Sequence, residues 1–191
     1  RREMMCTDGR CAPTPDANNV CSLAEEFPFF EPMGSSTVSQ RVTGTTGSGE
    51  GVLRPTLDCI PLEDSIGIEK VYLMTIPDGL WDLTVTTDAS GTGETDTLLY
   101  LRTNCFDSGS ELACDNDISD GNIRSRIDVS EIGAGTYALV VEQVGVMDEG
   151  EAPHEIVAVL KPVLATGEAC DPAEVENRCQ TGSCTAGVCT P

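Results

Sequence analysis

Residues 71–87 read Val-Tyr-Leu-Met-Thr-Ile-Pro-Asp-Gly-Leu-Trp-Asp-Leu-Thr-Val-Thr-Thr, and this stretch decides the fold class. On both sides of the Pro-Asp-Gly triplet, β-branched and aromatic residues recur with a period of two, which is the pattern of a half-buried β-strand. Proline, aspartate and glycine favour turns. The stretch therefore predicts two strands, at residues 71–76 and 81–87, with a turn at residues 77–79.

The same period of two recurs in other parts of the chain. We expect further strands at residues 97–103, 123–129, 137–141 and 156–160, and a weaker one at 38–42. No segment shows the 3.6-residue period of an amphipathic helix. Several short strands separated by turn residues, together with abundant threonine and glycine, indicate an all-β sandwich.

Two cysteine octets of similar sequence stand near the two ends of the chain. Residues 6–13 read Cys-Thr-Asp-Gly-Arg-Cys-Ala-Pro and residues 184–191 read Cys-Thr-Ala-Gly-Val-Cys-Thr-Pro, so five of eight positions agree at a constant offset of 178 residues. Self-similarity at a fixed offset indicates a repeating architecture. We expect a segment 1–19 that is loop-like and forms the second half of a cysteine-rich module, a β-sandwich over 20–163, and a complete disulfide-rich module over 168–191. The alternative is a chance likeness between cysteine-glycine-proline octets.

Composition restricts the compartment and the partners. Ten cysteines in 191 residues indicate an oxidising compartment, and we expect an extracellular or cell-surface location. The net charge of −21 repels phosphate backbones and anionic lipid, so nucleic acid and membrane surfaces are not expected as partners. The longest aliphatic run, residues 156–160, is far too short to span a bilayer, so no membrane insertion is expected.

Several motifs in the strand-forming region resemble one bacterial family. They are the stretch at residues 72–79, Asp-Thr-Leu-Leu-Tyr-Leu at residues 96–101 and Ala-Gly-Thr-Tyr at residues 134–137. Over residues 20–162 the chain resembles the bacterial pre-peptidase C-terminal domain, more narrowly the cysteine-bearing variants in large repetitive secreted proteins of myxobacteria-like organisms. The resemblance implies a jelly-roll-like β-sandwich of about eight strands and an accessory role without catalysis.

Local geometry suggests pairings for the four cysteines of the sandwich. Cys105 and Cys114 flank a polar hairpin tip, and their Cβ atoms can meet if the flanking strands pair. Cys21 and Cys59 are then left to tie the start of the sandwich to the segment before the strand at residues 71–76. We therefore expect the disulfides Cys105–Cys114 and Cys21–Cys59.

In the C-terminal module the interlaced pairing Cys170–Cys184 and Cys179–Cys189 is favoured, although sequence by itself does not fix connectivity. A zinc site is the rival reading, but the spacings lack the paired C-x₂₋₄-C form. The two cysteines of the N-terminal octet either bridge each other or pair with partners further upstream.

Oxygen-bearing side chains are densest at residues 115–122, which read Asp-Asn-Asp-Ile-Ser-Asp-Gly-Asn. Calcium takes six to eight oxygen ligands, so Asp115, Asp117 and Asp120 form a candidate calcium cage, which Asp96 approaches from the start of its own strand. The loop departs from the EF-hand pattern, because Arg126 occupies the position of the bidentate glutamate. The alternative is a plain acidic turn, since aspartate, asparagine and glycine are common turn residues.

Hydrolase chemistry finds little support in the sequence. His154 is the one histidine, and a Ser-His-Asp site requires it as base, yet the chain has no G-x-S-x-G elbow. We expect a surface histidine instead. The triplet at residues 107–109, Asp-Ser-Gly, occurs once, whereas aspartic-protease chemistry needs two facing carboxylates. It is interpreted as a turn, and no catalytic residue is assigned.

The sequence therefore favours a non-catalytic structural and interaction module of a secreted or cell-surface repetitive protein. Copies of the unit would stack head to tail in a fibre, stalk or adhesin, with other copies or adjacent repeats as partners. One alternative is an accessory domain of a secreted protease that binds substrate or polysaccharide. Another is a processed subunit of an extracellular filament.

Overall fold

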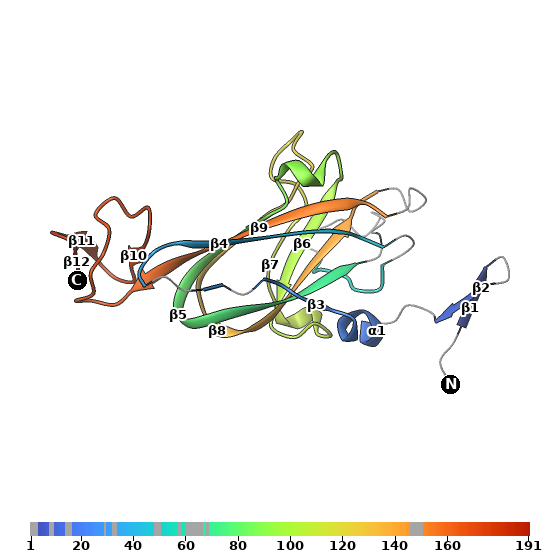
Figure 1. Cartoon of the computed structure of the whole chain (residues 1–191), viewed down its shortest axis with the longest axis horizontal. Coiled ribbons are helices and arrows are strands. Elements are labelled where there is room, and N and C mark those ends of the chain that lie inside the picture. The colour runs from blue at the N-terminus through green and yellow to red at the C-terminus, as the bar shows by residue number, and fades with distance from the viewer. Residues whose placement is uncertain are drawn as a thin grey trace.

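The chain is an all-β protein in which one large sheet is accompanied by two small hairpins (Figure 1). The computed structural model describes residues 4–7, 10–13, 17–28, 30–31, 34–47, 51–56, 59, 67, 69–145 and 151–191, with side chains from residue 20 onward. The elements are β1 (Met4–Thr7), β2 (Arg10–Pro13), α1 (Ala17–Ser22), β3 (Glu25–Glu26), β4 (Val38–Thr45), β5 (Lys70–Thr86), η1 (Ser90–Thr92), β6 (Thr97–Arg102), η2 (Ser108–Ser110), β7 (Glu111–Asp115), β8 (Arg126–Gln143), β9 (Pro153–Leu164), β10 (Arg178–Cys179), β11 (Ser183–Thr185) and β12 (Val188–Thr190). No helix among them is long and apolar enough to cross a membrane.

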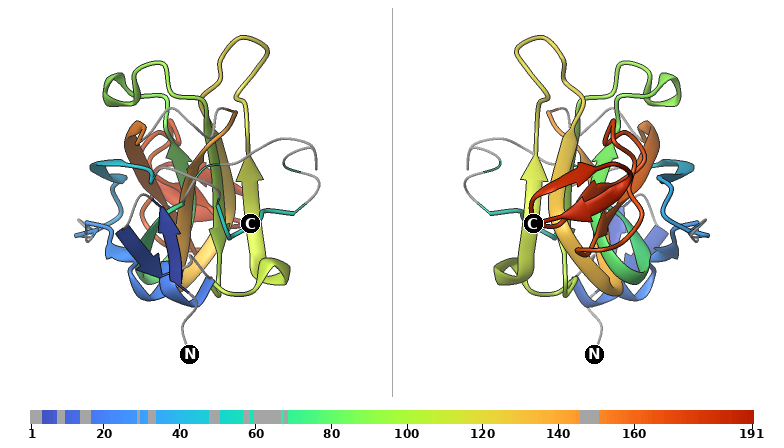
Figure 2. Two further views of the ribbon diagram at one scale, coloured as in Figure 1. Left: turned by 90° about the vertical axis from the view of Figure 1, so that its right-hand side faces the viewer. Right: turned by 90° about the vertical axis from the view of Figure 1, so that its left-hand side faces the viewer.

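The large sheet has eight strands and folds over on itself as a sandwich. Its order is β10-β9-β5-β8-β6-β7, with β3 beside β5 and β4 beside β9. The first half of β5 pairs with β3 and with the second half of β8, while its second half pairs with β9 and with the first half of β8. The two long strands therefore run through both layers, and the end-on views of Figure 2 show the layers facing each other.

The turn predicted at residues 77–79 is a bulge within one continuous strand. Between the pairs Ile76–Gly135 and Leu80–Gly133, β5 contains two residues more than β8. Ile76 and Trp81 are both buried in the core, although an odd spacing puts residues on opposite faces of a regular strand. The irregular backbone at this register shift interrupts the alternation, so that both side chains point inward, and it bends β5 from one layer into the other, as bulges do.

The predicted strand at 137–141 and residues 126–129 of the one predicted at 123–129 are likewise parts of one strand, β8, which begins at Arg126. Opposite Trp81 and Leu83, β8 carries one extra residue, and Glu131 in this bulge has a φ of 57°. The turn-forming residues between the two predicted strands therefore form a bulge within β8 and do not end the strand. The loop-like reading of residues 1–19 is also wrong, because β1, β2 and part of α1 lie there.

The main hydrophobic core fills the space between the two layers. Its buried residues come from both, for example Leu99 and Leu101 of β6 in one layer and Ile156 and Leu160 of β9 in the other. Trp81 is also part of this core. Alternate residues of β6, Leu98 and Tyr100, turn away from it and form a second buried cluster on the outer face, with Leu53 as a member.

Candidate interaction site: the cysteine module and its junction with the sandwich

The C-terminal module is built on the hairpin β11–β12. Ala186 and Gly187 connect the strands with φ values of 53° and 80°, and a two-residue type I′ turn requires two positive φ values. Cys184 lies opposite Cys189 in the register of the hairpin. Close packing extends to Gly182, where a Cβ atom would lie 1.9 Å from the carbonyl oxygen of Thr190.

Two interlaced disulfides hold the module together. Cys170 bonds to Cys184 and Cys179 bonds to Cys189, with Cα atoms 5.9 and 5.5 Å apart. These are the pairings that the sequence favoured. Sulfur atoms of three of these cysteines lie within 4.8 Å of one another, but the thiolates that a metal requires are absent from a disulfide. Leu164 packs against the sulfurs and completes a core too small to be stable without such crosslinks.

The module is joined to the sandwich by strand pairing and by a bidentate ion pair. β10 adds to β9 in parallel, and Arg178 in β10 donates from Nε to Oδ2 and from Nη2 to Oδ1 of Asp82, at 2.5 and 2.8 Å. The backbone N–H of Glu131 donates to Oδ1 of the same carboxylate at 3.1 Å. Burial acts to raise the pKa of Asp82, but these hydrogen bonds and the charge of Arg178 outweigh it and hold the pKa below its usual value.

A second set of contacts joins the module to the chain just before β4. The amide of Asn177, which is 3% exposed, donates to the carbonyl oxygen of Ser35 at 2.7 Å. Thr37 donates from its hydroxyl to the carbonyl oxygen of Glu176 at 2.7 Å. The module therefore contacts the sandwich at β5, β9 and the approach to β4, and these contacts restrict its motion.

The N-terminal hairpin repeats the backbone arrangement of the C-terminal one. In β1–β2 the register places Cys6 opposite Cys11 and Thr7 opposite Arg10. These pairs correspond, at the offset of 178 residues, to Cys184 opposite Cys189 and Thr185 opposite Val188. The two similar octets thus form the same kind of hairpin, and Figure 1 shows them at opposite ends of the sandwich.

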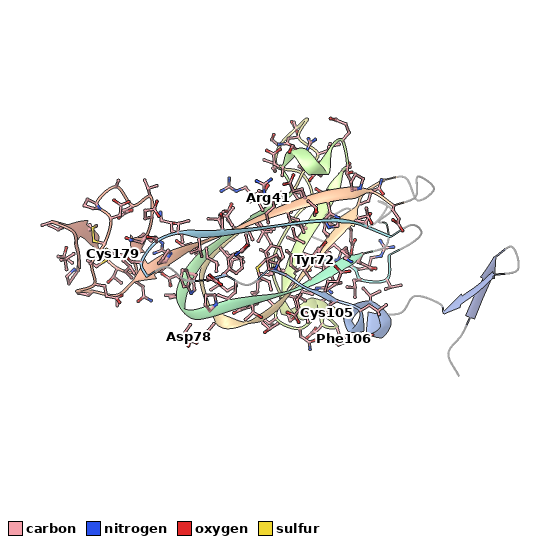
Figure 3. The ribbon with its side chains drawn as sticks, in the orientation of Figure 1. Arg41, Tyr72, Asp78, Cys105, Phe106 and Cys179 are labelled. Carbon is pink, nitrogen blue, oxygen red and sulfur yellow. A yellow bond between two sulfur atoms is a disulfide. The ribbon has the colours of Figure 1, made fainter. Side chains whose placement is uncertain are left out.

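The structure corrects the pairing predicted for the cysteines of the sandwich. Cys21 bonds to Cys105 and Cys59 bonds to Cys114, with Cα atoms 6.0 and 5.7 Å apart. The register of β6 and β7 places Cys114 opposite Tyr100, so Cys105 lies beyond the end of the paired strands. Cys105 is instead beside α1, which is visible in Figure 3. The observed bonds join residues 84 and 55 positions apart, whereas the predicted bond between Cys105 and Cys114 would have closed a short hairpin loop.

Buried charged groups lie on the outer face of β6 and β8, in the neighbourhood of the second buried cluster. Tyr100 donates a short hydrogen bond to Oε1 of Glu142, which is fully buried, and the Oε2 atom of Glu142 has no partner among the described residues. Arg102 stacks over the Tyr100 ring at 4.6 Å. Burial, together with the nearby charge of Glu69, raises the pKa of Glu142 well above the usual glutamate value.

Glu69 directly precedes β5. Its Oε1 atom accepts the backbone N–H groups of Val52 and Leu53, which ties these two residues to the start of β5. Glu111 performs the same task further along, since its Oε1 atom accepts from the backbone and hydroxyl of Thr56 at 3.2 and 2.9 Å. Glu111 of β7 therefore holds Thr56 against the sheet.

The residues of the predicted calcium cage lie on one loop but do not converge. Asp115 is half-buried and its Oδ2 accepts the backbone N–H of Arg126 at 2.7 Å, whereas Asp117 and Asp120 are exposed. Burial and the charge of Asp117 raise the pKa of Asp115. Within the described residues, which include Asp96, no three carboxylates bring oxygen atoms within 4.8 Å of one another. Calcium binding at this loop stays a prediction.

The prediction of a surface histidine is wrong. His154 is 1% exposed, and its Nε2 atom lies 2.8 Å from the hydroxyl of Tyr72, which Figure 3 places inside the sandwich. Burial, with a contribution from the charge of Lys70, lowers the pKa of His154 to about 4. A Cβ atom at Gly44 would lie 2.4 Å from the Tyr72 hydroxyl, so glycine is required to close the pocket. The Asp-Ser-Gly triplet forms a turn in which Asp107 caps η2.

Sequence reasoning missed the residues that join the parts of the molecule. Asp82 occupies a polar position between Trp81 and Leu83, where alternation predicts a solvent-facing side chain. Nothing in the pattern links it to Arg178, 96 residues later. For Glu142 a signal exists, because it directly follows the apolar run at residues 137–141, where an unpartnered acid is unexpected.

Comparison with known proteins gives little further information. No protein-family model matches the sequence, and no curated protein matches it either. Among solved structures, the chain is similar to PliG of Aeromonas hydrophila, described as a periplasmic lysozyme inhibitor of g-type lysozyme. The TM-score is 0.40 and the identity 11%, over 72% of this chain and 97% of that chain. So distant a likeness supports no conclusion about function.

The fold and the crosslinks define the class of protein to which this chain belongs. It is a disulfide-bonded all-β protein with four disulfides among its described residues. Such bonds form and persist outside the reducing cytosol, so the protein belongs in an extracellular or periplasmic compartment.

Proposed function

We propose that the chain is a non-catalytic structural unit of a repetitive secreted or cell-surface protein, and that copies of the unit stack head to tail. The observation that carries the proposal is the pair of matching hairpins at opposite ends of the sandwich, with the same register and the same cysteine positions. A hairpin that recurs every 178 residues places each sandwich between two cysteine modules. A fibre, stalk or adhesin is the assembly that this arrangement fits.

The junction at Arg178 supports the same proposal. A spacer between two repeats can fix their relative orientation only if it is itself held rigidly against the domain that it follows. Here β10 extends the sheet, Arg178 holds Asp82, and Asn177 holds the carbonyl of Ser35. The resemblance to cysteine-bearing pre-peptidase C-terminal domains points the same way, because those variants occur in repetitive secreted proteins.

A tandem chain tests the proposal. Because Pro191 corresponds to Pro13, a two-unit protein is obtained by joining residues 14–191 directly after Pro191. We expect negative-stain images and small-angle scattering to show two sandwiches at a fixed angle in one elongated particle. The matched control carries a flexible glycine-serine linker after Pro191, which should broaden the distribution of angles. Equal angular spread in the two proteins would overturn the proposal of a stiff array.

A further inference from the structure

The C-terminal module contains a short segment, residues 167–170, whose backbone pairs with the edge of the hairpin. Residues 167–170 lie along the outer edge of β12. The backbone N–H of Gly167 donates to the carbonyl of Cys189, Cys189 donates to Glu168, and Cys170 donates to Gly187, at 2.8, 2.9 and 3.0 Å. Ala169 forms a bridge with Val188 in the antiparallel sense. The segment thus adds to the hairpin as a strand, and its final residue is also crosslinked to β11.

The N-terminal hairpin has the same kind of outer edge, and among the described residues no other segment pairs with it. In a two-residue hairpin the pair next to the turn is hydrogen-bonded, and the following pair directs its N–H and C=O groups outward. The outward pair is Cys184 and Cys189 in one hairpin, and Cys6 and Cys11 in the other. In the part of the chain that the structure describes, β2 pairs with β1 and with no other strand. The outer edge of β2 therefore presents backbone N–H and C=O groups at the positions that correspond to those with which β12 binds residues 167–170.

We propose that the outer edge of β2 binds, by strand addition, the segment of a neighbouring unit that corresponds to residues 167–170. This inference rests on the proposed function, because it takes the partner to be another copy of the same unit. The contacts are those seen in the module: the bound segment donates to and accepts from the backbone of Cys11, as residues 167 and 168 do with Cys189. Backbone bonds supply the affinity in this mode of recognition, and the side chains supply the choice of segment.

Charge favours this partner over other extended segments. The first eleven residues contain Arg1, Arg2 and Arg10 against two acids, in a chain whose net charge is −21. Residues 165–177 contain four acids and no base. A short basic region and a short acidic region of the same chain attract each other, and this complementarity selects the correct segment and its orientation.

A synthetic peptide of residues 165–176 with Cys170→Ser tests the binding without thiol exchange. The peptide is titrated into the full chain labelled with ¹⁵N. We expect saturable shifts of the amides of residues 10–13, while β11–β12 stays unchanged because its edge is already occupied. The matched control peptide carries Cys170→Pro, which removes the N–H that bonds to Gly187 in the module. This peptide should bind at least tenfold more weakly.

Three results would overturn the inference: no shifts at residues 10–13, equal binding of both peptides, or shifts spread over the surface. The outcome is separable from that of the tandem chain. If the peptide does not bind but the two sandwiches of the tandem chain keep a fixed angle, the strand addition is wrong and the stiff array is supported. If the peptide binds but the angle between the two sandwiches of the tandem chain varies freely, the strand addition is supported and the stiff array is wrong.

Discussion

Arg178 and Asp82 form a bidentate ion pair, with two hydrogen bonds of 2.5 and 2.8 Å, although 96 residues separate them in the chain. Each side chain is 25% exposed, so the pair is shielded from solvent far better than the exposed pair Arg126–Asp128, whose side chains are 52% and 56% exposed. Planar, charge-assisted contacts of this kind define an orientation as well as an energy. The pair fixes the cysteine module to the sandwich.

We predict that Arg178→Met loosens the module. Loss of hydrogen bonds to a charged group costs roughly 1–3 kcal/mol, which lowers Tm by about 2–12 °C in a protein of this size. Limited proteolysis should then cut near residues 165–168 and release the module without reduction, because none of the four described disulfides crosses this point. Arg126→Met is the matched control and should change stability by no more than about 0.5 kcal/mol. Similar effects of the two substitutions would show that Arg178 is an ordinary surface residue.

His154 should remain neutral far below the usual pKa of histidine. Its pKa is lowered from 6.5 to about 4, so the stability that the buried neutral ring contributes is present above pH 6.5 and is lost as pH falls toward 4. The loss over that range is about 3 kcal/mol. Because the chain has one histidine, a single imidazole resonance reports the titration in an NMR experiment. A midpoint near 6.5 would contradict the buried position beside Tyr72.

Glu142 gives the opposite dependence on pH. Its pKa is raised well above 4.5 in the folded state, so its favourable contribution is full below pH 4.5 and is lost as pH rises toward the folded pKa. The slope reaches about 1.4 kcal/mol per pH unit for one proton. Glu142→Gln does not ionise, and should therefore lose less stability than the native chain between pH 5 and 9 in urea denaturation.

Glu94→Gln is the control for this measurement, because the Glu94 side chain is fully exposed. Its stability profile should run parallel to that of the native chain. If Glu142→Gln also runs parallel, the carboxyl of Glu142 is ionised in the folded state and the buried position is wrong.

Peptide mapping without reduction should link Cys21 to Cys105 and Cys59 to Cys114. Each bond closes a loop long enough to stabilise the fold by about 4 kcal/mol in the chain-entropy model. The double substitution Cys21→Ser with Cys105→Ser should therefore lower the stability of the whole sandwich. Removing Cys170 and Cys184 together should affect mainly the module. A peptide linking Cys105 to Cys114 would restore the pairing that the sequence suggested.

Local patterns predicted those parts of the structure that depend on neighbours in the chain. Alternation along residues 71–87 places Trp81 and Leu83 in the core, as observed. The interlaced disulfides of the module close loops of 14 and 10 residues, and a short loop leaves few possible partners. The prediction of a turn at residues 77–79 was wrong. A bulge and a turn favour the same residue types, and they differ only in whether the chain continues in the same strand or reverses direction.

The sequence by itself determined the all-β class, the oxidising compartment and the likeness of the two cysteine octets, because period, composition and identity are properties of the chain. Only the tertiary structure decided which cysteines of the sandwich meet, why His154 is buried, and that Arg178 finds Asp82. These are contacts between residues tens of positions apart. They depend on the register of β6 with β7 and on the path of β5 from one layer to the other, and no local pattern encodes either.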